Sequence, residues 1–259
     1  MRFAAGIEYD GSGFFGWQRQ SEGRTVQACV EKAISAVADH KVGIVCAGRT
    51  DTGVHATGQV IHFDTAAVRP ANNWLRGSNA NLPDDISVLW LTEADAAFHA
   101  RFSATQRHYR YIIYNHPARS ALLRNQVCWQ HQDLDADKMA RASQHLLGEH
   151  DFTSFRAVAC QAHSPIRTLH SLDIRRSGHF ITLDIVANAF LQHMVRCIAG
   201  VLIKIGCGEK PADWVSEVLQ AKDRRVSGVN APPAGLYLVD VRYPDHFQVP
   251  SCGRLPTFD

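Results

Sequence analysis

The residue types best suited to chemistry in this 259-residue chain gather in one loop, GRTDTGVHA, at residues 48–56. Asp51 lies between Gly48 and Gly53, two residues after Arg49. A loop tip bracketed by glycines can present an ionised carboxylate to a ligand, on which the carboxylate can act as a nucleophile or a base. The alternative is structural, because an Asp beside Thr and Gly commonly closes an Asx-turn.

Two other chemistries are suggested by the residues around Asp51. The glycine spacing matches G-x-x-x-x-G of a phosphate-binding P-loop, but Val54 and His55 stand where a P-loop needs Lys and then Ser or Thr. The loop is therefore not a P-loop. Asp51, His55, His62 and Asp64 could instead hold the metal ion of a metal-dependent hydrolase, whose turnover EDTA would abolish.

A second candidate is Arg196, which lies in an apolar segment, residues 188–206, that helical spacing predicts to be a helix. A guanidinium buried there needs an anion. Pairing with Asp51 would keep that carboxylate ionised, since a nearby cation lowers the pKa of an Asp by about 1–3 units. The alternative is that the Arg196 side chain extends along the helix surface to water.

The segment RHYRYIIY at residues 107–114 reads as a strand rich in tyrosine. Alternation gives it two faces, one with Arg107, Tyr109 and Tyr111 and the other with His108, Arg110 and Tyr114. One face could stack a nucleobase, although the aromatic RNP1 pattern of RNA-binding modules is not found in the sequence. The tyrosines could equally pack in a sheet core with their hydroxyls hydrogen-bonded.

The charge balance does not by itself indicate a nucleic-acid partner. The formal net charge is +2, and the basic residues are 21 Arg and 6 Lys. Arg is the better planar donor to phosphate, although a GC-rich genome would also favour its codons. Residues 96–132 contain no Asp or Glu and could form part of an anion-binding surface. The arginines of this stretch are Arg101, Arg107, Arg110, Arg119 and Arg124.

Length and composition are those of an ordinary globular chain. With 46% hydrophobic and 20% charged residues, the chain is neither disordered, nor fibrous, nor a coiled coil, and it can form one large or two modest domains. The longest apolar stretch, residues 194–206, is interrupted by Arg196 and Lys204 and is too short to cross a membrane. Glu8 interrupts any N-terminal signal sequence, so we expect a cytoplasmic protein.

The cysteines indicate a reducing compartment. Their number is odd and they include no C-x-x-C pair, so we expect buried thiols. Cys160 and His163 have a metal-like spacing, but no second pair is near them, and we predict no metal site there. The seven cysteines are Cys29, Cys46, Cys128, Cys160, Cys197, Cys207 and Cys252.

Hydrophobic periodicity predicts the element order βαββαβ twice. In the first half the strands are expected at residues 2–9, 42–47, 59–63 and 86–91, and the helices at 26–37, capped by Thr25, and 70–81. In the second half the strands are expected at 109–114, 169–175, 180–186 and 236–241, and the helices at 135–147, 188–206 and, in addition, 212–220.

This repeat predicts an α+β fold of two ferredoxin-like, RRM-like halves, with mainly antiparallel sheets that flank a central basic active-site cleft. The junction is expected within residues 93–105. Residues 1–98 would form the half that carries the Asp51 loop, and residues 99–259 the half that completes the cleft. Because several RNA-binding modules share this order, a non-catalytic RNA-binding protein of RRM-like fold is the alternative to an enzyme.

The loop at residues 48–56 resembles the catalytic loop of the tRNA pseudouridine synthase A family, whose usual form is GRTDAGVHA; the one departure is Thr52 in place of Ala. Four further blocks resemble the family and follow in its order along the chain. They are YDGSGFFGWQ at 9–18, FHARFSA at 98–104, NAFLQHMVR at 188–196 and GLYL at 235–238. Coincidence does not explain five ordered blocks.

The resemblance implies isomerisation of uridine to pseudouridine at positions 38 to 40 of the tRNA anticodon stem-loop, by a homodimer without a cofactor or metal. It implies that Asp51 acts at the sugar, that Arg196 completes the catalytic set, and that Tyr109 stacks on the target uracil and accepts a proton. Arg49 would help to extrude the target nucleotide, and Leu236 would form an apolar wall against the base.

The same resemblance assigns catalysis to neither His55 nor His62, which we expect to hold the loop. Thr52 adds a hydroxyl next to Asp51 and leaves the identity of the catalytic carboxylate unchanged. Two mechanisms remain open at this point, attack of the carboxylate on C1′ or removal of the 2′ proton to give a glycal. Release of tritium from C5-labelled uridine in tRNA would separate a synthase from a non-catalytic RNA-binding protein.

Overall fold

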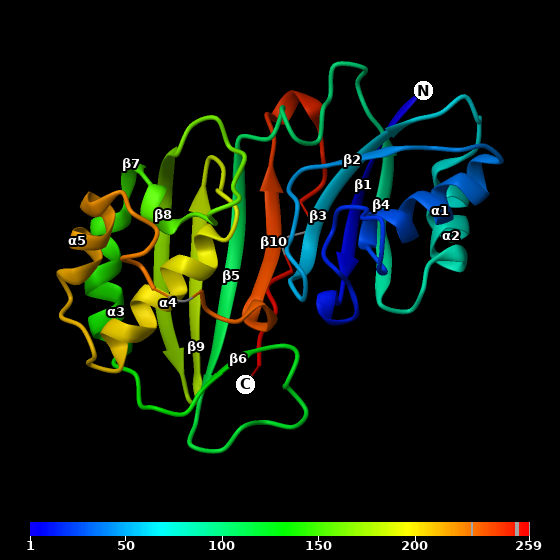
Figure 1. The fold of residues 1–259 in the computed structure, drawn as a ribbon. Coiled ribbons are helices and arrows are strands. Elements are labelled where there is room, and N and C mark those ends of the chain that lie inside the picture. The colour runs from blue at the N-terminus through cyan, green and yellow to red at the C-terminus, as the bar shows by residue number, and fades with distance from the viewer. Residues whose placement is uncertain (229, 252–253, 259) are drawn as a thin grey trace. The chain divides into compact units, whose positions relative to one another are not determined.

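The computed structural model describes residues 1–228, 230–251 and 254–258. These residues form five α-helices and ten β-strands, and the strand pairings are mostly antiparallel, so the predicted α+β class is confirmed. The chain divides into two compact units, residues 1–106 with 237–256 and residues 107–236 with 257–259 (Figure 1). Each unit has its own strands and helices.

The first unit begins with the order βαββαβ and receives one late strand. Strand β1 (Arg2–Tyr9) lies between β3 (His55–Asp64) and β4 (Ile86–Glu93) and is antiparallel to both. Strand β2 (Ile44–Cys46) pairs antiparallel with the end of β3. Strand β10 (Leu236–Arg242) pairs parallel with the beginning of β3, close to the loop that carries Asp51.

Two helices of the first unit, α1 (Val26–Ala38) and α2 (Ala71–Asn81), lie side by side (Figure 1). Trp74 of α2 is completely buried, and its ring centroid lies 5.5 Å from those of Phe3 in β1 and Phe63 in β3. These three rings join the helix layer to the strands. Of the apolar residues of α1 that helical spacing places on one face, Val37 is only partly buried, and the others are completely buried, namely Val26, Val30, Ala33 and Ile34.

The strands of the second unit pair in the order β5, β9, β8, β7, all antiparallel. Their bounds are β5 (Gln106–Asn115), β7 (Gly148–Asp151), β8 (Ile166–Ser177) and β9 (Phe180–Ala187). A short strand, β6 (Cys128–Gln130), pairs parallel with the end of β5. Strands β6 and β7 were not predicted, because three or four residues carry too little periodicity to be recognised.

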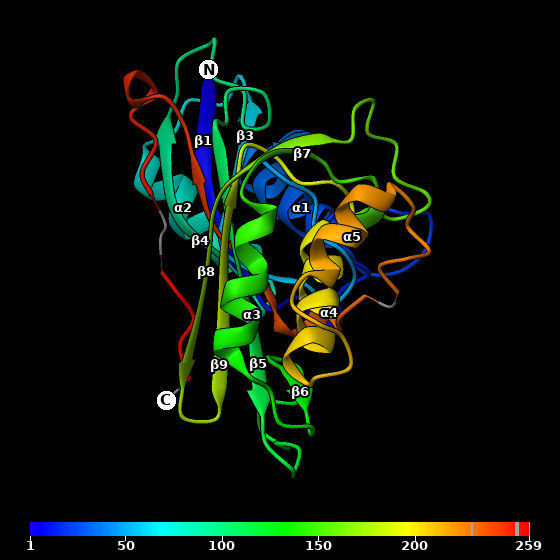
Figure 2. The same cartoon turned by 90° about the vertical axis from the view of Figure 1, so that its left-hand side faces the viewer.

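Helices α3 (Ala136–Ser143) and α4 (Met194–Gly206) lie side by side against the second unit's strands, and α5 (Trp214–Ala221) lies next to α4 (Figure 2). A Cβ atom on Gly206 would lie 2.7 Å from the sulfur of Met139 in α3. The absence of a side chain at Gly206 therefore permits the close packing of α3 on α4.

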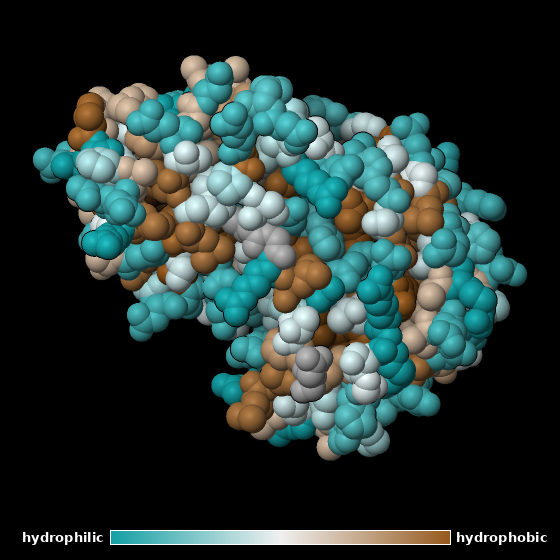
Figure 3. Space-filling view, turned by 180° about the vertical axis from the view of Figure 1, so that it is seen from behind, coloured by the Kyte–Doolittle hydropathy of each residue, from teal (hydrophilic) through white to brown (hydrophobic). Residues whose placement is uncertain are grey.

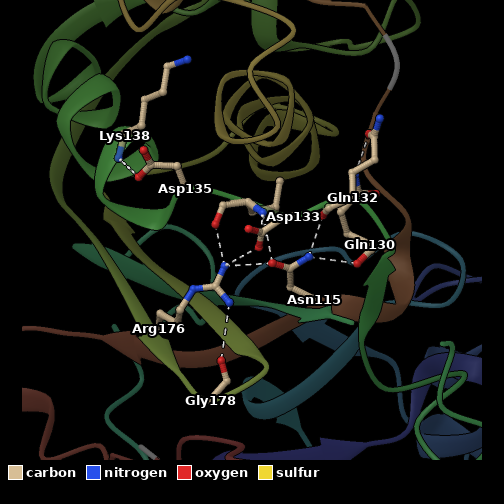
Figure 4. Close-up of polar contacts among 9 residues, drawn as sticks. Asn115, Gln130, Gln132, Asp133, Asp135, Lys138, Arg176 and Gly178 are labelled. Carbon is tan, nitrogen blue, oxygen red and sulfur yellow. Dashed lines mark hydrogen bonds and ion pairs between the residues drawn. The ribbon is translucent and has the colours of Figure 1, made fainter. Parts of the chain in front are cut away.

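A buried amide connects three segments of the second unit (Figure 4). The Nδ2 atom of Asn115, at the end of β5, donates to the main-chain oxygens of Gln130 (3.0 Å) and Gln132 (2.7 Å). Its Oδ1 atom accepts from the Leu134 N–H group (3.2 Å) and from Nη2 of Arg176 (2.8 Å). All the hydrogen-bonding capacity of the amide is used, which fixes β6, the start of α3 and β8 relative to β5.

Two predicted helix boundaries are wrong. The helix expected over residues 188–206 begins only at Met194, because His193 has a left-handed φ of 66° and precedes the first helical turn. The helix expected to end at Gly148 ends at Ser143 and is followed by a short 3-10 turn. Arg196 therefore lies in the first turn of α4 and not in the middle of a long helix.

The prediction that the cysteines are buried holds only for Cys128 and Cys197. The partly buried ones are Cys29, Cys46, Cys160 and Cys207, and Cys252 lies outside the described residues. Within the described part of the chain, no helix is long and apolar enough to cross a membrane. On the face shown in Figure 3, hydrophilic residues cover most of the surface, and hydrophobic residues show between them in separate groups.

Candidate active site

The loop that carries Asp51 joins β2 to β3 in the first unit, and its entry is fixed by a buried side chain. Gln59 of β3 is completely buried. Its Nε2 atom donates to the carbonyl oxygen of Gly48 (2.6 Å), and its Oε1 atom accepts from the Gly48 N–H group (3.3 Å). The N–H group of Ala47 donates to the carbonyl of Val60 (2.8 Å). The backbone is thus held directly before Arg49.

A second segment, residues 9–17, holds the middle of the loop. The hydroxyls of Tyr9 and Thr50 lie 2.8 Å apart in a buried hydrogen bond. The N–H group of Trp17 donates to the carbonyl oxygen of Thr50 (3.0 Å). Thr50 is thereby bound through both its side chain and its main chain, one residue before Asp51.

Two glycines of this segment allow its close approach to the loop. A Cβ atom on Gly11 would lie 1.9 Å from the carbonyl oxygen of Val54. Gly16 has a left-handed φ of 84°, and a Cβ atom there would lie 2.8 Å from the carbonyl oxygen of Thr50. Neither contact is compatible with a larger residue, so the spacing of glycines in YDGSGFFGWQ follows from packing against the Asp51 loop.

The same segment also caps helix α1. Main-chain carbonyls of Gly16 and Trp17 accept from the N–H groups of Val26 (3.2 Å) and Gln27 (2.9 Å). Thr25 occupies the predicted cap position, but its hydroxyl makes no capping hydrogen bond. The carbonyl groups of residues 16 and 17 therefore accept hydrogen bonds at the start of the helix, where the Thr25 side chain was expected to act as the cap.

Asp51 itself is half-buried at the tip of the loop. The turn is closed by the main chain, because the N–H group of Val54 donates to the carbonyl oxygen of Asp51 (3.1 Å). Gly53 has a φ of 76°, as a type II turn requires at its third residue. The neighbouring Arg49 and Thr52 are exposed. The loop therefore presents a carboxylate from a tightly held backbone.

His55 anchors the end of the loop. Its Nδ1 atom lies 3.1 Å from the Gly11 nitrogen and 3.1 Å from Oδ1 of Asp10. Its ring stacks on Tyr237 of β10, with centroids 4.7 Å apart. The hydrogen bond with His55 is the largest cause holding the pKa of the Asp10 carboxyl well below its usual range. His55 is therefore positioned to support the loop, as expected, whereas the side chain of His62 binds the Ala100 N–H group and does not hold the loop.

His62 and Asp64, the other members of the possible metal-hydrolase set, are occupied by structural contacts. The Nδ1 atom of His62 accepts from the Ala100 N–H group (3.0 Å), and burial lowers the pKa of this imidazole to about 4. Asp64 forms an ion pair with Arg2 (2.7 Å). Among the described residues, no three His, Cys, Asp or Glu side chains are placed to hold a metal ion together.

In the second unit, Tyr109 lies on β5 opposite Ile185 of β9. Its side chain is buried, and its ring meets Phe190 edge-to-face with centroids 4.9 Å apart. Phe190 belongs to the loop 188–193 that was expected to be helical. His108 and Arg110 both contact Asp184. These two side chains share the other face of β5, as strand alternation predicts.

Arg196 is half-buried and held at the start of α4. Its Nε atom donates to the carbonyl oxygen of Ala231 (2.9 Å), and its own carbonyl accepts from the Ala231 N–H group (3.0 Å). The neighbouring Tyr111 hydroxyl donates to the carbonyl of Pro232 (2.8 Å); burial raises the pKa of this phenol, which the charge of Arg196 opposes. The segment 230–232 therefore connects α4 to β5.

Leu236, the first residue of β10, is buried, and the preceding glycine fixes its place. A Cβ atom on Gly235 would lie 2.5 Å from the carbonyl oxygen of Ile112 in β5 and 2.9 Å from the nitrogen of Cys128 in β6. Only glycine allows this approach of the backbones. Within the second unit, strand β5 thus carries Tyr109, and contacts with β5 fix the segments that adjoin Arg196 and Leu236.

The arginines of residues 96–132 do not act as one group. Arg110 is buried in an ion pair with Asp184 (2.7 Å), and Arg107 donates to the carbonyl of Asn188 (2.9 Å). The expectation of an anion-binding surface is wrong for Arg110, whose charge is neutralised inside the unit. The exposed members are Arg101, Arg119 and Arg124.

Sequence reasoning missed the residues that immobilise the loop. The sequence predicts Gln59 only as the first residue of a strand, and the available signal is its polar side chain beside the apolar Val60 and Ile61. Tyr9, Gly11 and Gly16 belong to the block YDGSGFFGWQ, for which the sequence predicts no role in holding the loop. Their contacts with Thr50 and Val54 join segments about 40 residues apart, which local periodicity does not report.

A family model described as tRNA pseudouridine synthase matches residues 5–103 and 142–244, which include Asp51, Arg196 and Leu236 but not Tyr109. A protein of Shewanella sp. strain W3-18-1 named tRNA pseudouridine synthase A is 56% identical over 258 residues, covering 100% of this chain and 99% of that protein.

A protein of the same name from Shewanella baltica strain OS155 is 55% identical with the same coverage. Among solved structures, a chain of a Cbf5-Nop10-Gar1 complex matches 77% of this chain with a TM-score of 0.34 and 10% identity, a likeness too distant to define the fold. The match to the family model and the identity to the full-length relatives are sufficient to assign the family. This chain belongs to the tRNA pseudouridine synthase family.

Proposed function

We propose that this chain isomerises uridine to pseudouridine at positions 38, 39 and 40 of the tRNA anticodon stem-loop, with Asp51 as the catalytic carboxylate. The observation that carries the proposal is the Asp51 loop. The loop is bound on one side by Gln59 and on the other by Tyr9 and Trp17, so that a half-buried carboxylate is presented from a turn held by hydrogen bonds. Such preorganisation is what catalysis at a fixed sugar carbon requires.

The reaction breaks the N1–C1′ glycosidic bond, turns the freed uracil, forms a C5–C1′ bond and moves the C5 proton away, so that no atom is gained or lost. Asp51 acts at the sugar, either on C1′ or on the 2′ proton. Arg196, whose side chain is half-buried in the first turn of α4, completes the catalytic set as a cation. Tyr109 stacks on the uracil and accepts the C5 proton through its hydroxyl.

Substrate binding in this proposal uses two further residues. Arg49, exposed two residues before Asp51, takes the space left when the target nucleotide leaves the stem, a step that costs a few kcal/mol of unstacking. Leu236 forms an apolar wall against the extruded base. The protein works in the cytoplasm as a homodimer without a cofactor.

Asp51→Asn tests the central assignment, because the amide is nearly isosteric but uncharged. We expect the variant to release no tritium from C5-labelled uridine in tRNA, while its affinity for tRNA in filter binding changes by less than about tenfold, since phosphate contacts dominate affinity. Appreciable turnover would remove Asp51 from its role. If the wild type also released no tritium, the chain would be a non-catalytic RNA-binding protein.

The dimer and the target positions need separate measurements. Sedimentation without RNA should give about twice the chain mass, and a fully active monomer at micromolar concentration would contradict the dimer. Mapping of pseudouridines in total tRNA from a deletion strain should show uridine at positions 38 to 40, and pseudouridine retained there would contradict the proposed specificity.

A further inference from the structure

An exposed aromatic ring stands on a rigid turn of the first unit, in the block FHARFSA. The side chain of Phe102 is 75% exposed, although the neighbouring Phe98 and Ala100 are completely buried. The ring of His99 stacks on Phe102, with centroids 4.4 Å apart and planes at 28°. The guanidinium carbon of Arg101 lies 5.5 Å from the centre of the Phe102 ring.

The turn is held by its own hydrogen bonds. The Nδ1 atom of His99 accepts from the N–H groups of Arg101 (3.2 Å) and Phe102 (3.1 Å). The N–H group of His99 donates to Oγ of Ser103 (3.0 Å), and the Ser103 N–H group donates to the carbonyl of His99 (2.9 Å). His99 therefore both shapes the turn and supports the exposed ring.

The turn is also anchored in the core through Ala100. Its N–H group donates to Nδ1 of His62 (3.0 Å), and its carbonyl accepts from the Tyr243 hydroxyl (2.7 Å). Both the donor and the acceptor of this residue are used inside the unit. Phe102 is thus presented to solvent by a backbone that is fixed, at little further loss of conformational entropy when it binds a ligand.

Positive charge lies close to this ring. Arg101 and Arg49 are both exposed, and the charges of both oppose the rise that burial causes in the pKa of the partly buried Cys46 thiol. Arg49 belongs to the Asp51 loop. An exposed π-face, a supporting imidazole and two cations match the requirements of a single-stranded nucleotide, whose base stacks while its phosphates are neutralised.

We propose that Phe102, supported by His99 and flanked by Arg101, is a stacking platform for a second, unpaired base of the RNA substrate, distinct from the isomerised uracil. The proposal rests on the proposed function, since the RNA is that enzyme's substrate. The charge complementarity with Arg49 and Arg101 favours a nucleotide over a protein partner, which would be drawn to Phe102 by apolar area alone.

Filter binding of unmodified tRNA to full-length variants tests the platform. Phe102→Ala should raise Kd about 5- to 150-fold, the range expected for loss of one base–aromatic stack. Phe102→Leu, which keeps apolar bulk without a π-face, should weaken binding nearly as much. Phe102→Trp should restore Kd to within about threefold of the wild type. Val68→Ala, at another strongly exposed apolar side chain of the same unit, serves as the control and should leave Kd unchanged.

Three results would overturn the platform. The first is a wild-type Kd for Phe102→Ala, and the second is a wild-type Kd for Phe102→Leu, which would reduce the ring to apolar bulk. The third is a change in sedimentation of Phe102→Ala without RNA, which would assign the ring to a protein interface. Because Kd is measured independently of turnover, failure of Asp51→Asn to abolish catalysis would refute the proposed active site without affecting this comparison.

Arg101→Gln separates the charge from the ring. Loss of one phosphate contact should lower the slope of log Kd against log salt by about one, whereas Phe102→Ala should leave that slope unchanged. We expect this difference in salt slope because Arg101 contacts a phosphate whereas Phe102 stacks on a base. Equal salt slopes in all variants would contradict the part assigned to Arg101.

Discussion

The hydroxyl groups of Tyr9 and Thr50 lie 2.8 Å apart, in a buried hydrogen bond one residue before Asp51. Tyr9 is the last residue of β1, and Thr50 lies in the loop between β2 and β3. The bond therefore fixes the residue next to the proposed catalytic carboxylate to the end of a core strand.

Tyr9→Phe should cost about 1 to 3 kcal/mol in the free energy of unfolding, because it leaves the buried Thr50 hydroxyl without its partner. It should also lower the single-turnover rate at saturating enzyme, since Asp51 loses part of its support. Urea unfolding and tritium release measure the two effects. In a double-mutant cycle with Thr50→Val, the combined cost should be smaller than the sum of the single costs; additive costs would show that the hydroxyls do not interact.

Gly16→Ala should lower both stability and activity, because the alanine would face a left-handed φ of 84° and a contact of 2.8 Å with the Thr50 carbonyl oxygen. We expect a loss of about 2 to 4 kcal/mol in the free energy of unfolding. Gly43→Ala is the matched control, since nothing lies within 4 Å of its Cβ position.

Gly178→Ala isolates the backbone contribution, because Gly178 has a φ of 55° but open space around its Cβ position. This variant should cost about 1 kcal/mol and leave tritium release unchanged. If Gly16→Ala behaved like Gly178→Ala in both assays, the close approach of Gly16 to the Asp51 loop would not matter for catalysis.

The ring and the hydroxyl of Tyr109 should have separable roles. Tyr109→Phe keeps the π-face and should bind tRNA almost normally, yet lose about 10²- to 10⁴-fold in single-turnover rate if the hydroxyl is the proton acceptor. Tyr109→Ala should lose binding as well, by about 1 to 3 kcal/mol. Tyr114→Phe, on the opposite face of β5, is the control and should retain the wild-type rate.

Two other outcomes of these measurements would change the role assigned to Tyr109. A wild-type rate for Tyr109→Phe would leave the residue as a stacking platform only, with water or Asp51 accepting the proton. Wild-type behaviour of both variants would assign Tyr109 to packing against Phe190, the contact that its buried ring makes in the structure.

His62 should make the stability of the protein depend on pH between about 4 and 6.5. Burial lowers the pKa of this imidazole to about 4, so the unfolded chain binds a proton at its usual pKa of 6.5 before the folded protein does. The corresponding stability is fully present above pH 6.5 and is lost as the pH falls toward 4. From pH 7 to pH 5 the loss should be about 1 to 2 kcal/mol.

Urea unfolding at pH 7 and pH 5 measures this loss, with His62→Asn for comparison. The amide oxygen of Asn can still accept from the Ala100 N–H group but does not titrate. Although the variant is less stable at both pH values, it should lose less stability between them than the wild type. Equal losses would mean that His62 is not the group responsible.

Local sequence determined several elements of this protein almost to the residue. Strand β1 was predicted at residues 2–9, and α1 at residues 26–37, because alternation and helical spacing of apolar side chains depend only on near neighbours. The Asp51 loop was found in the same way, from an acidic residue between two glycines. For these segments the local pattern and the final packing require the same backbone.

The tertiary structure decided the rest, because the decisive contacts join residues far apart in the chain. The apolar segment 188–193 is not helical, since Asn188 binds Thr168 and His193 takes a left-handed conformation beside Asn230. Arg110 was counted as a surface cation and is neutralised by Asp184, 74 residues away.

The support of the Asp51 loop also exists only in three dimensions. A carboxylate between glycines is flexible in an isolated peptide, because glycine has the largest backbone freedom of any residue. Gln59, Tyr9 and Trp17 remove that freedom through hydrogen bonds to Gly48 and Thr50. Sequence alone thus located the carboxylate, whereas the fold made it rigid, since such bonds form only after β1 and β3 have paired.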